Sequence, residues 1–322
     1  SIMTIEYVSL HKDMTVSEAF EKIRKVGVNK ETIYTCYVTE NRKLIGVITV
    51  KDLFMADEDD KIADIMETHI ISVDTLEDKE IVGHMFRKYD FLALPVVDKD
   101  NRLVGIVTFD DAMDVIQDEN TEDFSKMAAI APNEESYFRT GIFKHAKSRI
   151  VWLLILMISA TITQIITNRY EAAFAAVPLL VSFMPMIMDT GGNCGSQSSV
   201  TVIRALSLDE LHFTDLFRVM WKEARTAVLC GAALAAACFL KILLVDRLLM
   251  GNESISLLVN GVVCLTLCVT VILAKFVGCT LPLFAKRLGF DPAVMASPFI
   301  TTIGEALSLL VYFLFAKLLL GV

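Results

Sequence analysis

Apolar residues are distributed very differently in the two halves of this chain. Beyond about residue 149 they form five long runs, each with at least the ~20 residues that a helix needs to cross the hydrocarbon core of a bilayer. The runs cover 149–168, 173–206 with a break at 190–195, 220–247, 255–284 and 293–320. This pattern predicts an all-α transmembrane domain with five helices over residues 141–322.

The first part of the chain combines short apolar runs with amphipathic segments, and it contains an internal repeat with a period of about 60 residues. Two pairs of segments correspond, 2–10 with 65–73 and 44–53 with 103–112. Strand-like runs occur at 36–39 and 94–97, and helical spacing occurs at 16–26 and 78–89. The repeat therefore predicts two α/β domains, residues 1–63 and 64–118.

Charge follows the same division. Residues 1–148 contain 18 basic and 29 acidic residues, a net charge of −11, whereas residues 149–322 contain 12 and 10, a net charge of +2. Such an acidic soluble part is unsuited to nucleic acid and suits cations. One cysteine, Cys36, lies in the soluble part and six lie in the apolar half. This is no disulfide framework, and it fits a reducing cytosol around the soluble part.

Basic residues at the ends of the apolar runs predict the orientation in the membrane. With the soluble part inside, the inner flanks carry nine of them: Lys144, Lys147, Arg149, Arg204, Arg218, Lys222, Arg225, Lys286 and Arg287. The outer flanks carry three: Arg169, Arg247 and Lys317. This bias predicts a cytoplasmic soluble part and an external C-terminus.

The second apolar run contains polar residues that lipid does not tolerate unless they face a cavity or other protein. Asp189 is followed by Gly191, Gly192, Asn193 and Gln197. An ionisable residue beside a glycine-rich break indicates a functional site, where freed carbonyl oxygens can turn toward an ion. A bound cation is the simplest partner for Asp189, although its carboxylate can instead cap a helix end.

In the fifth run, Ser297, Thr301 and Glu305 share one helical face at four-residue spacing, and Glu305 is the only acid deep in that run. Small hydroxyl residues also serve ordinary helix packing in membranes. Glu305 has an alternative partner in Lys275 of the fourth run. The sequence alone leaves both alternatives open.

Acidic residues also gather in the helical stretch that follows the second repeat. Asp111, Asp114 and Asp118 fall on one face, with Glu122 a further turn on. Like charges at this spacing repel, and the stretch serves either solubility or the binding of a divalent cation. Oxygen-rich sites of this kind favour Mg²⁺ or Ca²⁺ over softer metals.

The repeated part resembles a tandem pair of CBS domains, a Bateman module. Two Gly-x-x-Thr-x-x-Asp runs, 46–52 and 105–111, add to the resemblance. It implies that Thr49 and Asp52, or Thr108 and Asp111, hold the ribose and phosphate of ATP or another adenine nucleotide. The alternative is that these residues only form strand-end turns and helix caps.

Taken together, the proline and glycine pattern of the second run, the Asp291-Pro292 start of the fifth and the Thr-Thr-x-x-acid run at 301–305 resemble the MgtE family of magnesium channels. The resemblance implies a homodimer whose pore lies at the subunit interface between the second and fifth transmembrane helices. It assigns an ion pathway to Asp189, Gly192, Asn193, Ser196, Ser297, Thr301 and Glu305. Glu305 departs from the family's aspartate, and Ser196 stands where some members have asparagine.

The same resemblance implies feedback by cytosolic Mg²⁺. A connecting helix within residues 111–140, with its helical part from Asp111 to about residue 131, would plug the pore. Regulatory Mg²⁺ would bind Asp78, Glu80, Asp90, Asp111, Asp114, Glu119, Glu122 and Asp123. The family also has an acidic superhelical domain before the CBS pair, which this sequence does not contain. The start inside the first repeat favours a trimmed sequence, and a natural absence of the domain stays open.

The resemblance implies an integral protein of the bacterial inner membrane that takes up Mg²⁺ and contacts lipid and a second copy of itself. Two alternatives stay open: a CBS-regulated carrier of Mn²⁺, Co²⁺ or Ca²⁺, and a membrane-anchored nucleotide sensor without transport. An enzyme is disfavoured, because the sequence offers no nucleophile-base pairing, Walker loop or His/Cys metal spacing.

Overall fold

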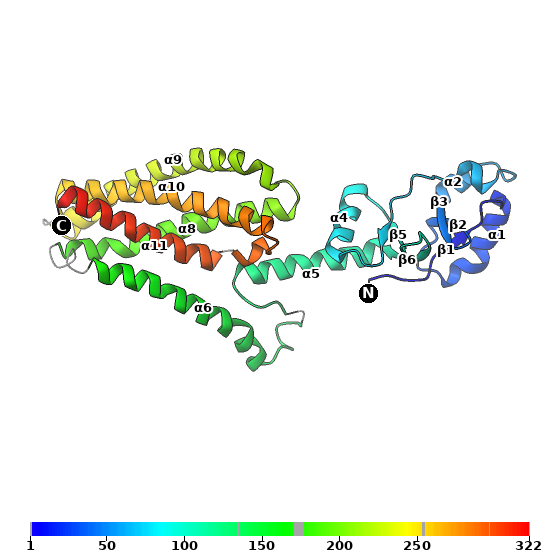
Figure 1. Ribbon diagram of the computed structural model, residues 1–322, viewed down its shortest axis with the longest axis horizontal. Coiled ribbons are helices and arrows are strands. Elements are labelled where there is room, and N and C mark those ends of the chain that lie inside the picture. The colour runs from blue at the N-terminus through cyan, green and yellow to red at the C-terminus, as the bar shows by residue number, and fades with distance from the viewer. Residues whose placement is uncertain (1, 134, 171–176, 253–254, 296, 322) are drawn as a thin grey trace. The chain divides into compact units, whose positions relative to one another are not determined.

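The computed structural model describes residues 2–133, 135–170, 177–252, 255–295 and 297–321. The chain forms two compact units, Ser1–Asn120 and Thr121–Val322 (Figure 1). The first unit mixes strands and helices, and the second is helical. The predicted combination of an α/β module and an all-α part is therefore confirmed.

The first unit repeats one topology, as the sequence predicts. Its first half contains β1 (Val8–Leu10), α1 (Val16–Val26), a 3₁₀ turn (Gly27–Asn29), β2 (Thr35–Glu40), β3 (Lys43–Thr49), α2 (Val50–Met55) and α3 (Ile62–Ile65). The second half contains β4 (Val73–Asp74), α4 (Lys79–Tyr89), β5 (Ala93–Val97), β6 (Leu103–Thr108) and the start of α5 (Phe109–Met127). In each three-stranded sheet the first pair is parallel and the second antiparallel.

The two repeats exchange their opening segments. Thr4 pairs with Ile106 of β6 in the second repeat, and Glu67 pairs with Val47 of β3 in the first. A core cluster that includes Tyr37, Leu44, Ala93 and Ile106 draws on both repeats. The repeats therefore form one interlocked module rather than two independent domains.

A glycine at the same place in each repeat permits this exchange. A Cβ at Gly105 would lie 2.5 Å from Met3 Cγ and 2.7 Å from the Thr4 carbonyl oxygen. A Cβ at Gly46 would collide in the same way with the side chain of Met66. Met3 and Met66 occupy matching places in the repeat, so the first glycine of each Gly-x-x-Thr run serves the contact between repeats.

The second unit consists mainly of long helices. It contains the end of α5, α6 (Ile142–Arg169), α8 (Leu179–Ser207), α9 (Leu216–Lys241), α10 (Leu257–Arg287) and α11 (Ser297–Phe315). A 3₁₀ turn (Phe213–Asp215) precedes α9 and another (Pro292–Met295) precedes α11, while π-helical segments (Ile242–Leu249 and Ala316–Leu320) follow these two helices. Helix α8 packs against both α10 and α11, and α9 packs against α10 (Figure 1).

Four helices in the described part of the chain are long and apolar enough to cross a membrane: residues 142–169, 213–249, 257–287 and 298–320. Helix α8 has 29 residues but is not among these four, because its centre carries Asp189, Asn193 and several glycines. The predicted count of five membrane helices stays a prediction.

Two predicted details are wrong. The break expected at 190–195 is absent, since α8 runs without interruption from Leu179 to Ser207 with Pro185 inside it. Its glycines instead allow close contact with neighbouring helices. The connecting helix α5 ends at Met127 instead of about residue 131, because Ala129 takes a left-handed conformation with φ 53° that a right-handed helix cannot continue.

Candidate functional site

The structure brings the polar residues of the second and fifth predicted spans together. A Cβ at Gly192 of α8 would lie 2.7 Å from Thr301 Cγ2 and 3.5 Å from Glu305 Cγ, both of α11. Only glycine leaves room for this approach. Gly192 is therefore a neighbour of Thr301 and Glu305, two predicted pathway residues that lie more than a hundred positions further along the sequence.

Neighbouring glycines extend this close contact along α8. A Cβ at Gly191 would meet Ser308 Oγ and lie 3.3 Å from the Gly304 carbonyl oxygen. On the other side, a Cβ at Gly278 of α10 would collide with the carbonyl oxygen of Gly195. Small residues of this kind let helix backbones approach closely in membranes. They fix α8 between α10 and α11.

One face of α8 is polar and uncovered by its own chain. Asp189, Asn193 and Gln197 recur at four-residue spacing and are all exposed, whereas Gly191, Gly192 and Gly195 on the packed side are buried. Ser196 is half-buried at the edge of this face. We call Asp189, Asn193, Ser196 and Gln197 the polar face of α8. Its oxygen atoms are ligands of the kind that Mg²⁺ and its bound waters prefer.

Glu305 lies beside this face and is half-buried. Asp189 acts on it electrostatically, and among the described residues neither carboxylate forms an ion pair with a basic side chain. Two neighbouring carboxylates without a basic partner attract a cation. Asp189 lies in the interior of α8, so the alternative of a helix cap is wrong.

Ser297 is the first residue of α11, but its side chain lies outside the described residues. Thr301 is half-buried, one turn before Glu305 on the same helix. The predicted shared face of Thr301 and Glu305 is therefore confirmed, and the place of the Ser297 hydroxyl stays a prediction.

Lys275, the alternative partner for Glu305, is engaged elsewhere. Its ammonium group lies 3.6 Å from Glu223 Oε2 of α9, and Lys275 is only 6% exposed. Ser198 of α8 donates a hydrogen bond to the same Glu223 oxygen at 2.8 Å. This buried cluster was not predicted from the sequence, although a lysine in the middle of an apolar run indicates that a buried partner is required.

The predicted regulatory acids of the first unit lie on α4 and α5. Asp78 caps α4 by accepting a hydrogen bond from the Glu80 backbone N–H, and Asp90 ends the same helix in a left-handed conformation with φ 54°. Asp111 and Asp114 lie in the first turns of α5. Glu119 is paired with Lys79 of α4 at 3.0 Å, so α4 and α5 are joined by an ion pair.

Three charged residues form a second cluster in the helical unit. Lys126 near the end of α5 contacts Glu122 at 2.7 Å and Asp291, just before α11, at 2.6 Å. Burial lowers the pKa of Lys126, but the hydrogen bonds and charges of Asp291 and Glu122 outweigh burial and raise it well above its usual value. Glu122 is thus partly neutralised in this chain. Asp123 lies beside it and is half-buried.

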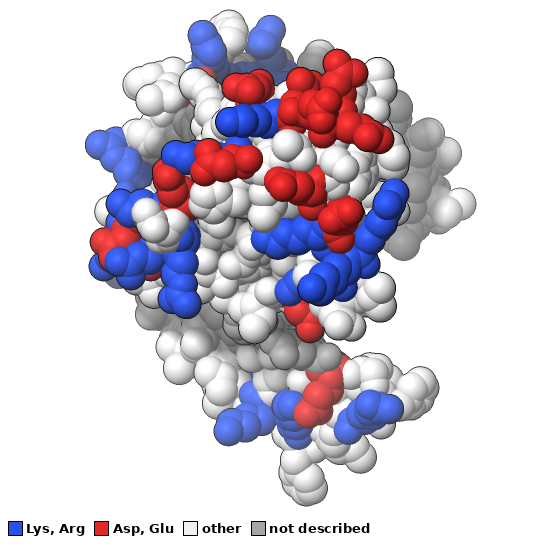
Figure 2. All heavy atoms as spheres, turned by 90° about the vertical axis from the view of Figure 1, so that its right-hand side faces the viewer, with Lys and Arg blue, Asp and Glu red and all other residues white. Residues whose placement is uncertain are grey.

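In the part of the chain that the structure describes, no group of three or more His, Cys, Asp or Glu side chains could hold a metal ion. Figure 2 shows one face of the molecule on which acidic side chains form a group with basic side chains nearby. The sites for regulatory Mg²⁺ at Asp78, Glu80, Asp90, Asp111, Asp114, Glu119, Glu122 and Asp123 stay a prediction.

A cavity of about 430 Å³ lies in the first unit, and its lining includes Thr49, Asp52, Glu67, His69 and Asp90. Thr49 Oγ1 donates to Asp52 Oδ2 at 2.5 Å, and the two residues form a reciprocal cap at the start of α2. The structural role expected of the Thr-Asp pair is therefore confirmed there. In the second repeat, Thr108 donates to Asp111 at 2.8 Å.

Comparison with known proteins identifies the class of protein to which this chain belongs. Residues 1–59 and 62–118 match the CBS domain, and residues 184–315 match MgtE, a divalent cation transporter family. The chain is an integral membrane transporter of divalent cations that carries a tandem CBS module, and not an enzyme.

Relatives that match nearly the whole of this chain identify its family. The chain is 37% identical over 320 residues to the magnesium transporter MgtE of Thermus thermophilus, covering 99% of this chain and 69% of the relative. It is 37% identical to MgtE of Bacillus subtilis, covering 97% and 67%. The chain belongs to the MgtE family of magnesium transporters, and it spans about two thirds of these relatives.

Two solved structures are similar to part of the chain. One is the soluble part of a magnesium transporter, 46% identical over 37% of this chain and 46% of that chain, with a TM-score of 0.36. The other is the cytosolic domain of the Mg²⁺ channel MgtE in complex with ATP, 44% identical over 35% of this chain and 46% of that chain, with a TM-score of 0.35.

Proposed function

We propose that this chain takes up Mg²⁺ through a pore formed between two copies, each contributing α8 and α11. The observation that carries the proposal is the polar face of α8 beside Glu305, where Asp189, Asn193 and Gln197 are exposed. Among the described residues, neither Asp189 nor Glu305 forms an ion pair with a basic side chain. A polar, acidic face is costly against lipid. A second copy related by a twofold axis would place the same face opposite and enclose a hydrophilic path.

The chemistry of this path suits a largely hydrated Mg²⁺. The ion loses its waters reluctantly, so oxygens that bind through water are better ligands than a tight dehydrated cage. Asp189, Asn193 and Thr301 offer such oxygens, and Glu305 supplies charge next to them. Glutamate reaches farther than the aspartate typical of the family, so Glu305 narrows the path or favours direct contact with the ion.

The CBS module and α5 regulate this path in the proposal. High cytosolic Mg²⁺ bridges acidic side chains of α4, α5 and a second copy and favours a closed arrangement in which α5 plugs the pore. Without Mg²⁺ these carboxylates repel one another and the closed arrangement loses population. Each ion shifts the balance only by its difference in affinity for the two states.

An adenine nucleotide is the proposed occupant of the cavity in the first unit. A volume of about 430 Å³ lies within the range of small-molecule sites. The hydroxyl of Thr49 and the carboxylate of Asp52 lie at its wall and can bind ribose hydroxyls. The membrane orientation is proposed from the basic flanks, with the CBS module in the cytoplasm and the C-terminus outside.

The test is ion flux into proteoliposomes containing the full chain. We expect Mg²⁺ uptake, competition by Mn²⁺, Co²⁺ and Ca²⁺ weaker than by Mg²⁺ itself, and severe loss of uptake in Glu305→Ala with intact dimer on size-exclusion chromatography. Glu305→Asp should retain uptake with altered competition. Glu31→Ala, which removes an exposed carboxylate from the first unit, is the matched control.

The alternatives give different results in the same experiment. A carrier of another divalent cation would transport Mn²⁺, Co²⁺ or Ca²⁺ in preference to Mg²⁺. A membrane-anchored nucleotide sensor would show no flux in any ion. Normal Mg²⁺ uptake by Glu305→Ala would remove Glu305 from the pathway.

A further inference from the structure

The first turns of α9 carry a basic outer face. Arg218, Lys222 and Arg225 follow one another at four- and three-residue spacing, which puts them on one side of the helix. All three are exposed, and so is Trp221, with 66% of its surface accessible. The aromatic residue lies among the basic ones rather than in the core.

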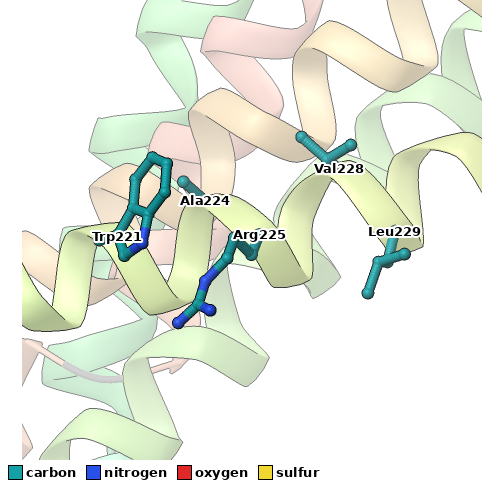
Figure 3. Close-up of a pocket in the computed structure, with 5 residues that line it drawn as sticks. All are labelled: Trp221, Ala224, Arg225, Val228 and Leu229. Carbon is teal, nitrogen blue, oxygen red and sulfur yellow. The ribbon is translucent and has the colours of Figure 1, made fainter.

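A shallow groove of about 400 Å³ lies on this face, lined by Trp221, Ala224, Arg225, Val228 and Leu229. Figure 3 shows these side chains projecting from successive turns of α9. The Arg225 guanidinium lies 5.8 Å from the centre of the Trp221 ring, within the range of a cation–π contact. Further along α9 the lining consists of the apolar side chains of Val228 and Leu229, which are 55% and 74% exposed.

The positive charge of the groove is available to a ligand. The acid of this stretch, Glu223, points inward to Lys275 and Ser198 and so does not neutralise the outer face. Arg218 contacts Asp215 at 3.5 Å. Among the residues that the structure describes, Lys222 and Arg225 have no acidic partner.

The groove also lies at the end of a candidate membrane span, residues 213–249. Along α9 the outer face changes from basic residues and Trp221 to the apolar Val228 and Leu229 within about two turns. This order matches the change from headgroups to acyl chains in a bilayer, where tryptophan prefers the interface.

We propose that this groove binds an anionic phospholipid. Its phosphate contacts Arg225 and Lys222, the Trp221 ring lies at the level of the glycerol backbone, and one acyl chain follows Val228 and Leu229. The proposal is independent of the ion pathway, which lies on α8 and α11.

Other occupants fit the groove less well. A free phosphate ion would use the basic residues and leave the apolar walls exposed. A second copy docked symmetrically on the same surface would bring its own Arg225 and Lys222 against these residues, and like charges repel. A phospholipid with an anionic headgroup offers the phosphate and the hydrocarbon in one molecule.

The test is native mass spectrometry of the full chain, released from detergent after incubation with phosphatidylglycerol or phosphatidylcholine. We expect the parent protein to retain phosphatidylglycerol in preference to phosphatidylcholine. Arg225→Gln should weaken retention of phosphatidylglycerol about five-fold, and adding Lys222→Gln should remove the preference. Arg225→Lys should keep part of it, because lysine retains the charge without the planar guanidinium.

Arg247→Gln is the matched control, since it removes the same charge from an exposed position at the other end of the same span. It should leave the preference unchanged, and all variants should elute as the parent does on size-exclusion chromatography. Three results would overturn the proposal: equal retention of the two lipids by the parent, an unchanged preference in the double variant, or displacement of the lipid by millimolar inorganic phosphate.

Discussion

Gly192 of α8 and Thr301 of α11 meet at a point where even a methyl group has no space. A Cβ at residue 192 would lie 2.7 Å from Thr301 Cγ2 and 3.3 Å from the Thr301 carbonyl oxygen. The backbone carbonyl cannot move away without shifting α11 itself. The separation of the two helices that carry the proposed pathway is therefore set by a residue that has no side chain.

Gly192→Ala should push α8 and α11 apart and displace Glu305 from the polar face of α8. Overpacking of this kind typically costs about 1–3 kcal/mol, so we expect a lower melting temperature in detergent together with reduced Mg²⁺ uptake in proteoliposomes. The matched control is Gly261→Ala on α10, where a Cβ would meet nothing within 4 Å. An uptake rate in Gly192→Ala equal to that of the control would show that this contact does not set the pathway.

The same contact explains why one sequence-based prediction was wrong. Glycine lowers the stability of a helix interior by about 1 kcal/mol relative to alanine, so Gly191, Gly192 and Gly195 indicated a break in α8. Tertiary packing reverses this local preference, because these glycines admit the backbones of α10 and α11. A single sequence shows that glycine lowers the stability of its own helix. It does not show the neighbouring helix whose close approach requires glycine.

Other parts of the fold could be predicted because their signals are local or repeated. The CBS repeat was visible as two copies of one pattern, and the shared face of Thr301 and Glu305 follows from helical spacing. The exchange of opening segments between the repeats was not predicted, because the contact of Met66 with Gly46 joins one repeat to the other and the pattern within each repeat does not reveal it. The pairing of Glu223 with Lys275 joins positions 52 residues apart, and spacing cannot reveal it.

Removing one member of the Glu223–Lys275 pair should destabilise the helical unit. Glu223→Gln leaves the Lys275 ammonium buried without a counter-charge, which typically costs about 3–5 kcal/mol. The measurement is thermal unfolding of the full chain in detergent. Replacing both residues, Glu223→Leu with Lys275→Met, should recover much of the loss, since no charge is then left buried.

This experiment also separates two roles for Lys275. If Lys275 neutralised Glu305 instead, Lys275→Met would change the ion competition in proteoliposomes while Glu223→Gln would not. We expect the double variant to keep the selectivity of the parent protein.

The first unit should lose stability in alkaline solution because of two buried side chains. Burial raises the pKa of the Cys36 thiol to about 12, and it also raises the pKa of the Tyr37 hydroxyl. Both folded-state values lie above the unfolded ones, so the stabilisation is complete below the unfolded pKa of Cys36 and is lost as pH rises toward 12. In this window the thiol ionises only in the unfolded chain. The free energy of unfolding therefore falls by about 1.4 kcal/mol per pH unit.

The check is the melting temperature of the full chain between pH 8 and pH 11. Cys36→Ala should lower it at every pH, because a buried side chain is shortened, but should flatten its decline above pH 9. Cys268→Ala, in the helical unit, serves as the control for loss of a thiol. An equally steep decline in Cys36→Ala would show that the Cys36 thiol does not contribute to alkaline unfolding.

Neutralising Asp90 and Asp114 together should weaken the closure of the pathway by Mg²⁺. Asp90 ends α4 and Asp114 is exposed on α5. Among the described residues, neither forms an ion pair of the kind that joins Glu119 to Lys79. They are therefore available to an ion that also contacts a second copy. With Asp90→Asn and Asp114→Asn the repulsion in the open state falls and the ion loses ligands in the closed state, so closure should need several-fold more Mg²⁺.

The measurement is flux into proteoliposomes as a function of Mg²⁺ on the side of the CBS module. Asp57→Asn with Asp59→Asn, which removes the same charge from the loop after α2, is the control and should close at the same concentration as the parent. Closure of the Asp90 and Asp114 variant at that same concentration would remove these residues from the regulatory site while leaving the ion pathway intact.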